Sequence, residues 1–238
     1  MHTIEIFWTS LPSTLTTKHI CKENLKILNI DEEIQTFFSY KVEFKKLEFL
    51  IGRALSKKIL SQKMKINPEE VYFCKNKFGK LYLDSKIHSL KNSEKLYFNI
   101  SHTDGLIICI VSKGCDVGID IETIKTMPFE IINDIFTPLQ TQYIYSTKSE
   151  WEINSRFYEI WTRKEAYLKS LGTGIVEGLN NLNVPFGQKH RWENWEFSTN
   201  KLCDTYIFST AIKNNSFTKY TYVIRQIQFN ELILNFSN

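Results

Sequence analysis

The sequence of this chain predicts an α+β fold made of two similar halves, each an antiparallel sheet packed with helices. Three observations lead to this class. Two long stretches, residues 31–65 and 150–171, repeat apolar residues at three- and four-residue steps, as amphipathic helices do. Shorter stretches typical of strands surround both of them. No glycine- or proline-rich linker divides the chain, so we expect two closely packed domains, residues 1–115 and 116–238.

Each element of the first half follows from its local pattern. Residues 31–65 place lysine and glutamate between the apolar positions, which predicts a helix packed on one side. Asn67 before Pro68 indicates a short helical turn, and Gly79 indicates a reversal of the chain. The expected strands are residues 2–9, 71–76, 96–101 and 106–112.

The second half starts with a strand over residues 116–122, which completes an antiparallel meander with the two strands before it. Two helices follow, over residues 128–146 and 150–171. The second helix has Ser149 as its N-cap and Gly172 just beyond its end. The remaining short strands are expected at residues 179–186, 192–199, 206–212 and 220–229.

The composition is that of a globular protein of a reducing cytoplasm. Hydrophobic residues make up 42% of the chain and aromatic residues 14%, which excludes a disordered protein. Five cysteines without a CxxC pair argue against a zinc site or a disulfide framework. The N-terminal residues lack the pattern of a signal peptide, and no apolar run approaches the roughly 18 residues of a membrane span. We therefore expect a cytoplasmic location and no contact with a membrane.

The net charge of +4 narrows the choice of partner. It is far below the charge density of a dedicated DNA-binding protein, so we expect no nucleic-acid partner. A mildly basic chain is compatible with an acidic protein partner or a phosphate-rich ligand. We expect the protein itself to be a monomer.

Two acids lie within the strand expected over residues 116–122. Asp120 and Glu122 are two residues apart, so a strand points both carboxylates to one face and the apolar Ile119 and Ile121 to the other. Two solvated acids at a strand end are the simpler interpretation. Like charges on one face repel each other, however, unless a cation lies between them. Mg²⁺ would suit the pair because it prefers carboxylate, water and phosphate oxygens.

A third acid and a lysine share one face of the helix over residues 150–171. Glu165 and Lys169 are four residues apart, and a surface ion pair is one interpretation of that spacing. Trp161 and other apolar neighbours indicate that much of the helix is buried. If Glu165 joins the two acids of the strand, three carboxylates form a metal site, and Lys169 faces a phosphate one helical turn away.

Ser101 and His102 lie where the strand over residues 96–101 ends. A lone histidine in a loop is more often solvated than functional. Ser101 could equally be a hydroxyl that stabilises the turn. Both interpretations stay open on these residues alone.

Taken together, the motifs resemble those of the 4′-phosphopantetheinyl transferases, and within them the longer Sfp-type group. That family shows FNxSH, then (V/I)GxDxE, then WxxKEAxxK followed by a glycine-containing turn. The matching stretches here are FNISH at 98–102, VGIDIE at 117–122, WTRKEAYLK at 161–169 and GTGI at 172–175. FGK at 78–80 is similar to the family's aromatic-Gly-Lys-Pro stretch. Each motif is weak alone, but their order and spacing make the set specific.

The resemblance implies a fold, a reaction and a cofactor. Family members of this length are pseudo-dimers of two α+β halves, with the active site in the cleft between them. They transfer the phosphopantetheine arm of coenzyme A to a serine of an apo acyl or peptidyl carrier protein and release 3′,5′-ADP. Mg²⁺ is required, with Mn²⁺ as the alternative, and the C-terminal half would carry the metal site.

The resemblance also implies roles for individual residues. Asp120, Glu122 and Glu165 would bind the metal, and Glu165 would also accept the proton of the serine hydroxyl. Lys169 would stabilise the leaving 3′,5′-ADP, and His102 would join these two residues in the catalytic group. The expected contacts to coenzyme A are Lys80, Ser101, His102, Lys164, Lys169 and Arg53.

Some positions depart from the family pattern. Leu81 stands where proline is usual, and Gln140 stands where a glutamate is usual, which puts a supporting contact in doubt rather than the metal ligands. The basic residues of the first half do not align cleanly. Lys45, Lys46 and Arg53 are candidates for gripping the 3′-phosphate, and a solvated helix face is the simpler interpretation for the two lysines.

The resemblance implies an acidic helical carrier protein as partner, which a mildly basic, apolar-rimmed face would attract. Residues 128–151, rich in Ile, Phe and Tyr, are a candidate for that face, and ordinary helix core is the alternative.

Two other functions use the same residues. One is a Mg²⁺-dependent hydrolase or transferase acting on another nucleotide pyrophosphate. The other is a non-catalytic module that only binds a carrier protein. Modification of an apo carrier protein by coenzyme A distinguishes the transferase from both.

Overall fold

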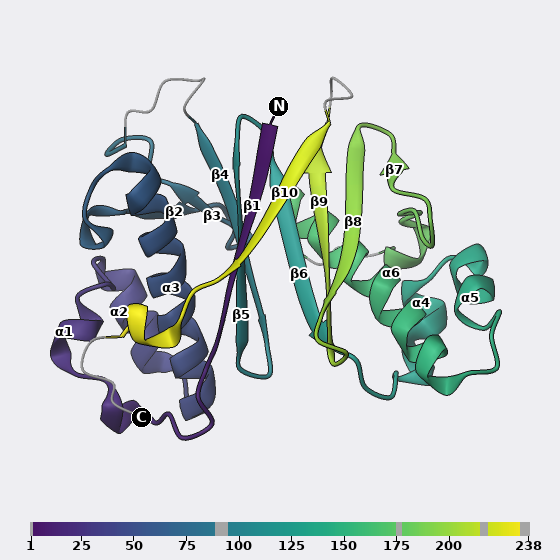
Figure 1. The fold of residues 1–238 in the computed structure, drawn as a ribbon, viewed down its shortest axis with the longest axis horizontal. Coiled ribbons are helices and arrows are strands. Elements are labelled where there is room, and N and C mark those ends of the chain that lie inside the picture. The colour runs from purple at the N-terminus through teal and green to yellow at the C-terminus, as the bar shows by residue number, and fades with distance from the viewer. Residues whose placement is uncertain (1, 89–94, 175–177, 215–218, 234–238) are drawn as a thin grey trace. The chain divides into compact units, whose positions relative to one another are not determined.

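The computed structural model describes residues 2–88, 95–174, 178–214 and 219–233 (Figure 1). The chain forms two compact units. Unit 1 comprises residues 1–75, 81–114 and 220–238, and unit 2 comprises residues 76–80 and 115–219. These units differ from the division at residues 115/116 in where they place residues 76–80, Cys115 and residues 220–238. That division stays a prediction about the domains.

Unit 1 contains a four-stranded sheet with strand order β10-β1-β5-β4, and the helices of this unit lie on one side of the sheet (Figure 1). Its strands are β1 (His2–Ser10), β4 (Leu96–Thr103), β5 (Leu106–Lys113) and β10 (Tyr220–Gln226). Its helices are α1 (Lys22–Leu25), α2 (Asp31–Ser39) and α3 (Glu43–Met64). A separate two-stranded sheet consists of β2 (Phe73–Lys75) and β3 (Leu81–Leu83).

The helical pattern of residues 31–65 forms two helices rather than the one that was expected. α2 ends before Tyr40 and α3 begins after Val42, because both of these residues have extended backbone conformations. The core of unit 1 lies between α3 and the sheet. Alternate residues of the central strand β5, Ile107, Cys109 and Val111, belong to that core together with the apolar face of α3.

Among the described residues, the last strand pairs with the first. β10 runs parallel to β1, with Ile4 opposite Tyr222 and Trp8 opposite Gln226. The other pairings of this sheet are antiparallel, as expected. Local residue patterns predict that residues 220–229 include a strand, but not which distant strand it joins.

Unit 2 contains a second four-stranded sheet, with strand order β6-β9-β8-β7, and its long helix α6 packs against β6 and β9. The strands are β6 (Val117–Thr123), β7 (Arg191–Trp192), β8 (Trp195–Leu202) and β9 (Tyr206–Lys213). The helices are α4 (Ile132–Ile135), α5 (Pro138–Ile144) and α6 (Glu150–Leu171). The ends of α6 are confirmed: Ser149 Oγ accepts a hydrogen bond from the Glu152 N–H, and Gly172 closes the helix at φ 68°.

Three expectations for unit 2 are wrong. β6, expected to complete a meander with the two strands before it, belongs to a separate sheet and pairs with β9. The single helix expected over residues 128–146 is broken, because Pro138 begins α5 at its first position and Thr137 before it is extended. Residues 179–186, expected as a strand, contain a 3₁₀ turn at Leu179–Asn181 and no strand, although this whole segment is described.

The two units repeat one topology. In unit 1 the chain runs β1, α3, β4, β5, and β5 lies between β1 and β4. In unit 2 it runs β6, α6, β8, β9, and β9 lies between β6 and β8. Both helices have 22 residues. The predicted α+β class with two related halves is confirmed.

Candidate active site

β6 presents its two acids to α6. Gly118, two residues before Asp120, lies against the helix so closely that an added Cβ would be 1.9 Å from the Ala166 carbonyl oxygen. Asp120 and Glu122 share this face because side chains alternate along a strand. The apolar Val117, Ile119 and Ile121 occupy the other face and are buried. The expectation that both carboxylates share one face is therefore met.

The neighbouring turn of α6 brings Lys169 and Glu165 to these acids. Lys169 Nζ lies 2.5 Å from Asp120 Oδ1, although Asp120 is only 4% exposed. Burial raises the pKa of Glu165 to about 7, with further contributions from the charges of Asp120 and Glu122, and Lys169 opposes the shift. Glu165 therefore lies within the electrostatic influence of both strand acids, and the four side chains form one cluster on unit 2.

Glu122 has a partner that the sequence did not point to. The indole Nε1–H of Trp161 donates a hydrogen bond to Glu122 Oε1 at 3.4 Å. Trp161 lies one helical turn before Glu165, so it lies on the same side of α6. The only prior signal was the place of Trp161 in the WTRKEAYLK motif, which gave no role for the indole.

Lys80 lies at the C-terminal end of α6. The tip of the β2–β3 hairpin, residues 76–80, belongs to unit 2 and packs on the C-terminal end of α6. Asn76 Nδ2 donates to the Gly172 carbonyl at 2.6 Å, and Lys80 Nζ donates to the Ser170 carbonyl. Burial lowers the pKa of Lys80. In the GTGI turn, residues 172–174 are described, whereas Ile175 lies outside the described residues.

The expected role of Lys164 as a phosphate contact is not supported by its position. Its side chain is fully buried, and Nζ donates to the carbonyls of Ile135 and Leu179 at 2.6 and 2.7 Å. Burial lowers its pKa to about 7. Lys164 instead holds α6 to the segments around residues 135 and 179. The spacing of one residue from Glu165 already places it on a different face of the helix.

Arg163, which precedes Lys164 in the motif, is likewise a structural residue. Its guanidinium donates to Thr199 Oγ1 at 2.7 Å and to the carbonyls of Pro185 and Lys189 at 2.8 and 2.9 Å. These bonds tie α6 to β8 and to the loop before β7, and thereby fix the rotation of the helix that carries Glu165.

The expected coenzyme A contacts of unit 1 lie on β4 and α3. Ser101 is buried on β4, and His102 is exposed, with Nδ1 3.3 Å from Glu48 Oε2. Arg53 is largely buried, and its Nε lies 2.6 Å from Glu33 Oε1. This ion pair and the stacking of Arg53 on Phe49 support a structural role for Arg53.

Gln140 is also part of the fold. It is fully buried, Nε2 donates to the Val184 carbonyl at 3.0 Å, and Oε1 accepts from the Thr137 N–H at 3.1 Å. An ionised glutamate could not donate to that carbonyl. Glutamine in place of the family's usual glutamate is therefore explained by the hydrogen bond that its amide donates to Val184.

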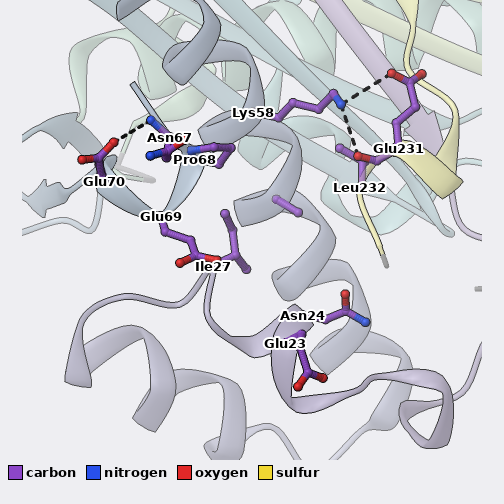
Figure 2. Close-up of a pocket in the computed structure, with 11 residues that line it drawn as sticks. Glu23, Asn24, Ile27, Lys58, Asn67, Pro68, Glu69, Glu70, Glu231 and Leu232 are labelled. Carbon is purple, nitrogen blue, oxygen red and sulfur yellow. Dashed lines mark hydrogen bonds and ion pairs between the residues drawn. The ribbon is translucent and has the colours of Figure 1, made fainter. Parts of the chain in front are cut away.

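Figure 2 shows a pocket of about 470 Å³ in unit 1, which is not the candidate site. Two of its four acids already have structural partners. Glu70 accepts from the Asn67 N–H at 2.7 Å, and Glu231 lies 3.5 Å from Lys58 Nζ. None of the motif residues lines it.

The carboxylates of Asp120, Glu122 and Glu165 have the chemistry of a divalent-cation site. Glu165 Oε1 is buried and has no hydrogen-bond partner within the part of the chain that the structure describes. A cation would relieve both this and the repulsion that raises the pKa of Glu165. Nevertheless, no three acidic, histidine or cysteine side chains of the described residues are already arranged around a metal position. The metal site therefore stays a proposal.

Comparison with known proteins shows the family. Residues 116–218 match the model of the 4′-phosphopantetheinyl transferase superfamily, and residues 14–114 match that of the N-terminal part of 4′-phosphopantetheinyl transferases. The chain belongs to this superfamily and is of the Sfp-like type. The predicted resemblance and enzyme class are confirmed: it is a transferase that moves phosphopantetheine to carrier proteins, and coenzyme A is the donor in this family.

Individual relatives agree with the family match. The chain is 33% identical to the 4′-phosphopantetheinyl transferase gsp of Aneurinibacillus migulanus over 187 residues, which cover 78% of this chain and 73% of gsp. It is 31% identical to HetI of Nostoc sp. over 54% of this chain and 53% of HetI. It is 26% identical to Sfp of Bacillus subtilis over 58% of each chain. The last two matches thus span little more than half of those relatives.

Proposed function

We propose that this chain transfers the 4′-phosphopantetheine group of coenzyme A to a serine of an apo acyl or peptidyl carrier protein. The serine oxygen forms a bond to the phosphorus that carries the pantetheine, the bond from that phosphorus to the 3′,5′-ADP oxygen breaks, and the serine proton passes to a base. The observation that carries the proposal is the cluster of Asp120, Glu165 and Lys169 between β6 and α6, in a chain of this family.

Glu165 is the proposed base. Its raised pKa of about 7 means that this buried carboxylate can take up a proton near neutral pH. Burial excludes competing water from one of its oxygens, because Oε1 is enclosed. Trp161 holds Glu122 through the indole N–H and so keeps the neighbouring carboxylate on the same side.

Lys169 is the proposed stabiliser of the leaving 3′,5′-ADP. Its side chain is 30% exposed, so a ligand can reach it while it remains next to Asp120. A positive charge placed before the reaction favours the charge that develops on the departing phosphate. Lys80, Ser101 and His102 are the further proposed contacts to coenzyme A. Lys164 and Arg53 are not included because buried protein groups occupy their side chains.

Mg²⁺, with Mn²⁺ as the alternative, would be held by Asp120, Glu122 and Glu165. When bound, such an ion neutralises charge on a pyrophosphate and orients it. The enclosed Glu165 oxygen and the excess of negative charge in the cluster support this assignment.

Some of residues 128–151 form helix core, and others are exposed as a face that contacts the carrier protein would be. Ile132, Ile135, Phe136 and Ile144 belong to the core of unit 2. Four other large side chains are exposed: Phe129 at 60%, Leu139 at 62%, Tyr145 at 44% and Trp151 at 51%. These exposed side chains support the proposal that this stretch contacts the carrier protein.

We further propose that the protein acts as a cytoplasmic monomer without a nucleic-acid or membrane partner. The modest net charge of +4 supports the first of these exclusions. None of the helices in the described ranges is both long and apolar enough to cross a membrane.

The test is the mass of an apo carrier protein after incubation with this protein, coenzyme A and Mg²⁺. A gain of one phosphopantetheine group is the expected result. Glu165→Gln should abolish the gain, whereas Glu150→Gln, at an exposed position of the same helix, should not. Breakdown of coenzyme A without a change in carrier mass would indicate a hydrolase instead. Carrier binding without either reaction would indicate a binding module.

A further inference from the structure

Glu48 is a buried carboxylate of α3 that the proposed reaction does not use. It is 0% exposed and is contacted by three donors. Lys45 Nζ lies 2.6 Å and His102 Nδ1 3.3 Å from Oε2, and the Gly105 N–H donates to Oε1 at 3.1 Å. Glu48 therefore joins the first turns of α3 to the end of β4 and to the turn that follows it.

The charge of Glu48 determines which nitrogen of the His102 ring carries a hydrogen. Burial by itself raises the pKa of Glu48, but hydrogen bonds from His102, Lys45 and Gly105 outweigh burial and lower it to about 2. The carboxylate is thus ionised at neutral pH and can only accept hydrogen bonds. The nitrogen of His102 that faces it, Nδ1, must therefore carry a hydrogen.

The other nitrogen of the ring is then left for a ligand. The side chain of His102 is 43% exposed even though Nδ1 is directed to a buried group. In the protonated ring both nitrogens donate, so Nε2–H is available to a phosphate oxygen while Glu48 keeps Nδ1–H. Carboxylates hold metal-binding histidines in one tautomer by the same arrangement.

The backbone around His102 is held by the same carboxylate. Asp104 and Gly105 both have left-handed backbone conformations, with φ of 42° and 80°. A Cβ at Gly105 would lie 3.1 Å from the ring of Phe44, so this turn packs tightly on α3. The Glu48–Gly105 hydrogen bond fixes the turn three residues after His102, which restricts the ring as well as its tautomer.

We propose that Glu48 is a positioning residue for His102: it accepts the Nδ1 hydrogen and so leaves Nε2–H of the protonated ring to donate to a phosphate of the coenzyme A substrate. The identity of this ligand rests on the proposed function. The tautomer does not, because it follows from the contacts within unit 1.

The first test is the side-chain ¹⁵N NMR spectrum of histidine-labelled protein, with the His102 signals assigned from His102→Gln. We expect the neutral ring of the wild type to be hydrogen-bearing at Nδ1. Glu48→Gln replaces the charged acceptor by a weaker, neutral amide oxygen and should reduce this preference, whereas Glu48→Met removes the acceptor and should abolish it. Glu43→Gln is the matched control, since Glu43 is on the same helix and binds Thr17 instead. A Nδ1–H fraction in the Glu48→Gln protein equal to that of the wild type overturns the inference, whether or not the methionine variant folds.

The second test is the affinity for coenzyme A, measured calorimetrically without a divalent metal. Loss of one charge-assisted hydrogen bond corresponds to about a tenfold increase in Kd, expected for Glu48→Gln and for His102→Gln alike. The double variant should bind no more weakly than His102→Gln, because Glu48 acts through His102. Multiplying effects would show that Glu48 acts by another route. Carrier modification by the wild type separates this outcome from failure of the proposed function.

Discussion

Replacing Gly118 by alanine should separate β6 from α6 and disrupt the acidic cluster. Gly118 does not have a left-handed backbone, so an alanine is not conformationally strained there. The obstacle is space, because the new Cβ would lie 1.9 Å from the Ala166 carbonyl oxygen, 2.6 Å from the Ser170 nitrogen and 2.9 Å from Ser170 Cβ. Two of these three atoms belong to the backbone of α6, so no side-chain rotation can relieve the contact.

The magnitude follows from these distances. Ordinary contact begins near 3.4 Å, so the helix and the strand must move apart by about 1.5 Å. Overpacking of this kind costs about 1–3 kcal/mol, and the upper end or more is expected where the backbone must shift. Asp120 follows on the same face of β6, and Lys169 precedes Ser170 on α6. The 2.5 Å contact between Asp120 and Lys169 should therefore be lost.

Urea unfolding and Mn²⁺ binding measure the two consequences. We expect Gly118→Ala to reduce the free energy of unfolding by about 3 kcal/mol and to weaken Mn²⁺ binding at least tenfold. The matched control is Gly52→Ala in α3, where the Cβ would meet only two side-chain atoms, at 3.9 and 4.0 Å. That variant should gain about 0.5–1 kcal/mol because alanine favours a helix. A Gly118→Ala protein as stable as the wild type would refute this account of the β6–α6 contact.

Three further predictions concern buried charges. Because the pKa of Glu165 is raised from 4.5 to about 7, the metal-free protein should lose about 2 kcal/mol of stability as the pH rises from about 5 to 7. Glu165→Gln should flatten that decline in urea unfolding, and an equally steep decline in the variant would contradict the assignment. Lys164→Met should lower the free energy of unfolding by about 1–3 kcal/mol, because two buried carbonyls lose their donor. Its calorimetric affinity for coenzyme A should stay unchanged, and a marked loss would restore Lys164 as a phosphate contact. Glu33→Gln should cost about 3–5 kcal/mol in thermal unfolding, since Arg53 and Lys57 lose their shared buried counter-charge. A loss below about 1 kcal/mol would show that this ion network is not required.

The periodicity of single elements was sufficient to predict much of the candidate site. A strand alternates its side chains, so Asp120 and Glu122 had to share a face wherever β6 lay. A helix repeats about every four residues, so Glu165 and Lys169 also had to share one. Both rules depend only on local geometry, and for that reason they needed no knowledge of the fold. The order of the motifs then indicated the family.

Local rules could not assign the partners of the other charged residues. Lys164 and Arg53 are basic residues in or near motifs. Lys164, however, is bound to two buried carbonyls, and Arg53 forms an ion pair with Glu33. The contact of Gly118 with α6, the indole bond of Trp161 to Glu122 and the parallel pairing of β10 with β1 all join segments far apart in the chain. Burial and hydrogen bonding depend on which surfaces meet, and only the folded chain brings those surfaces together.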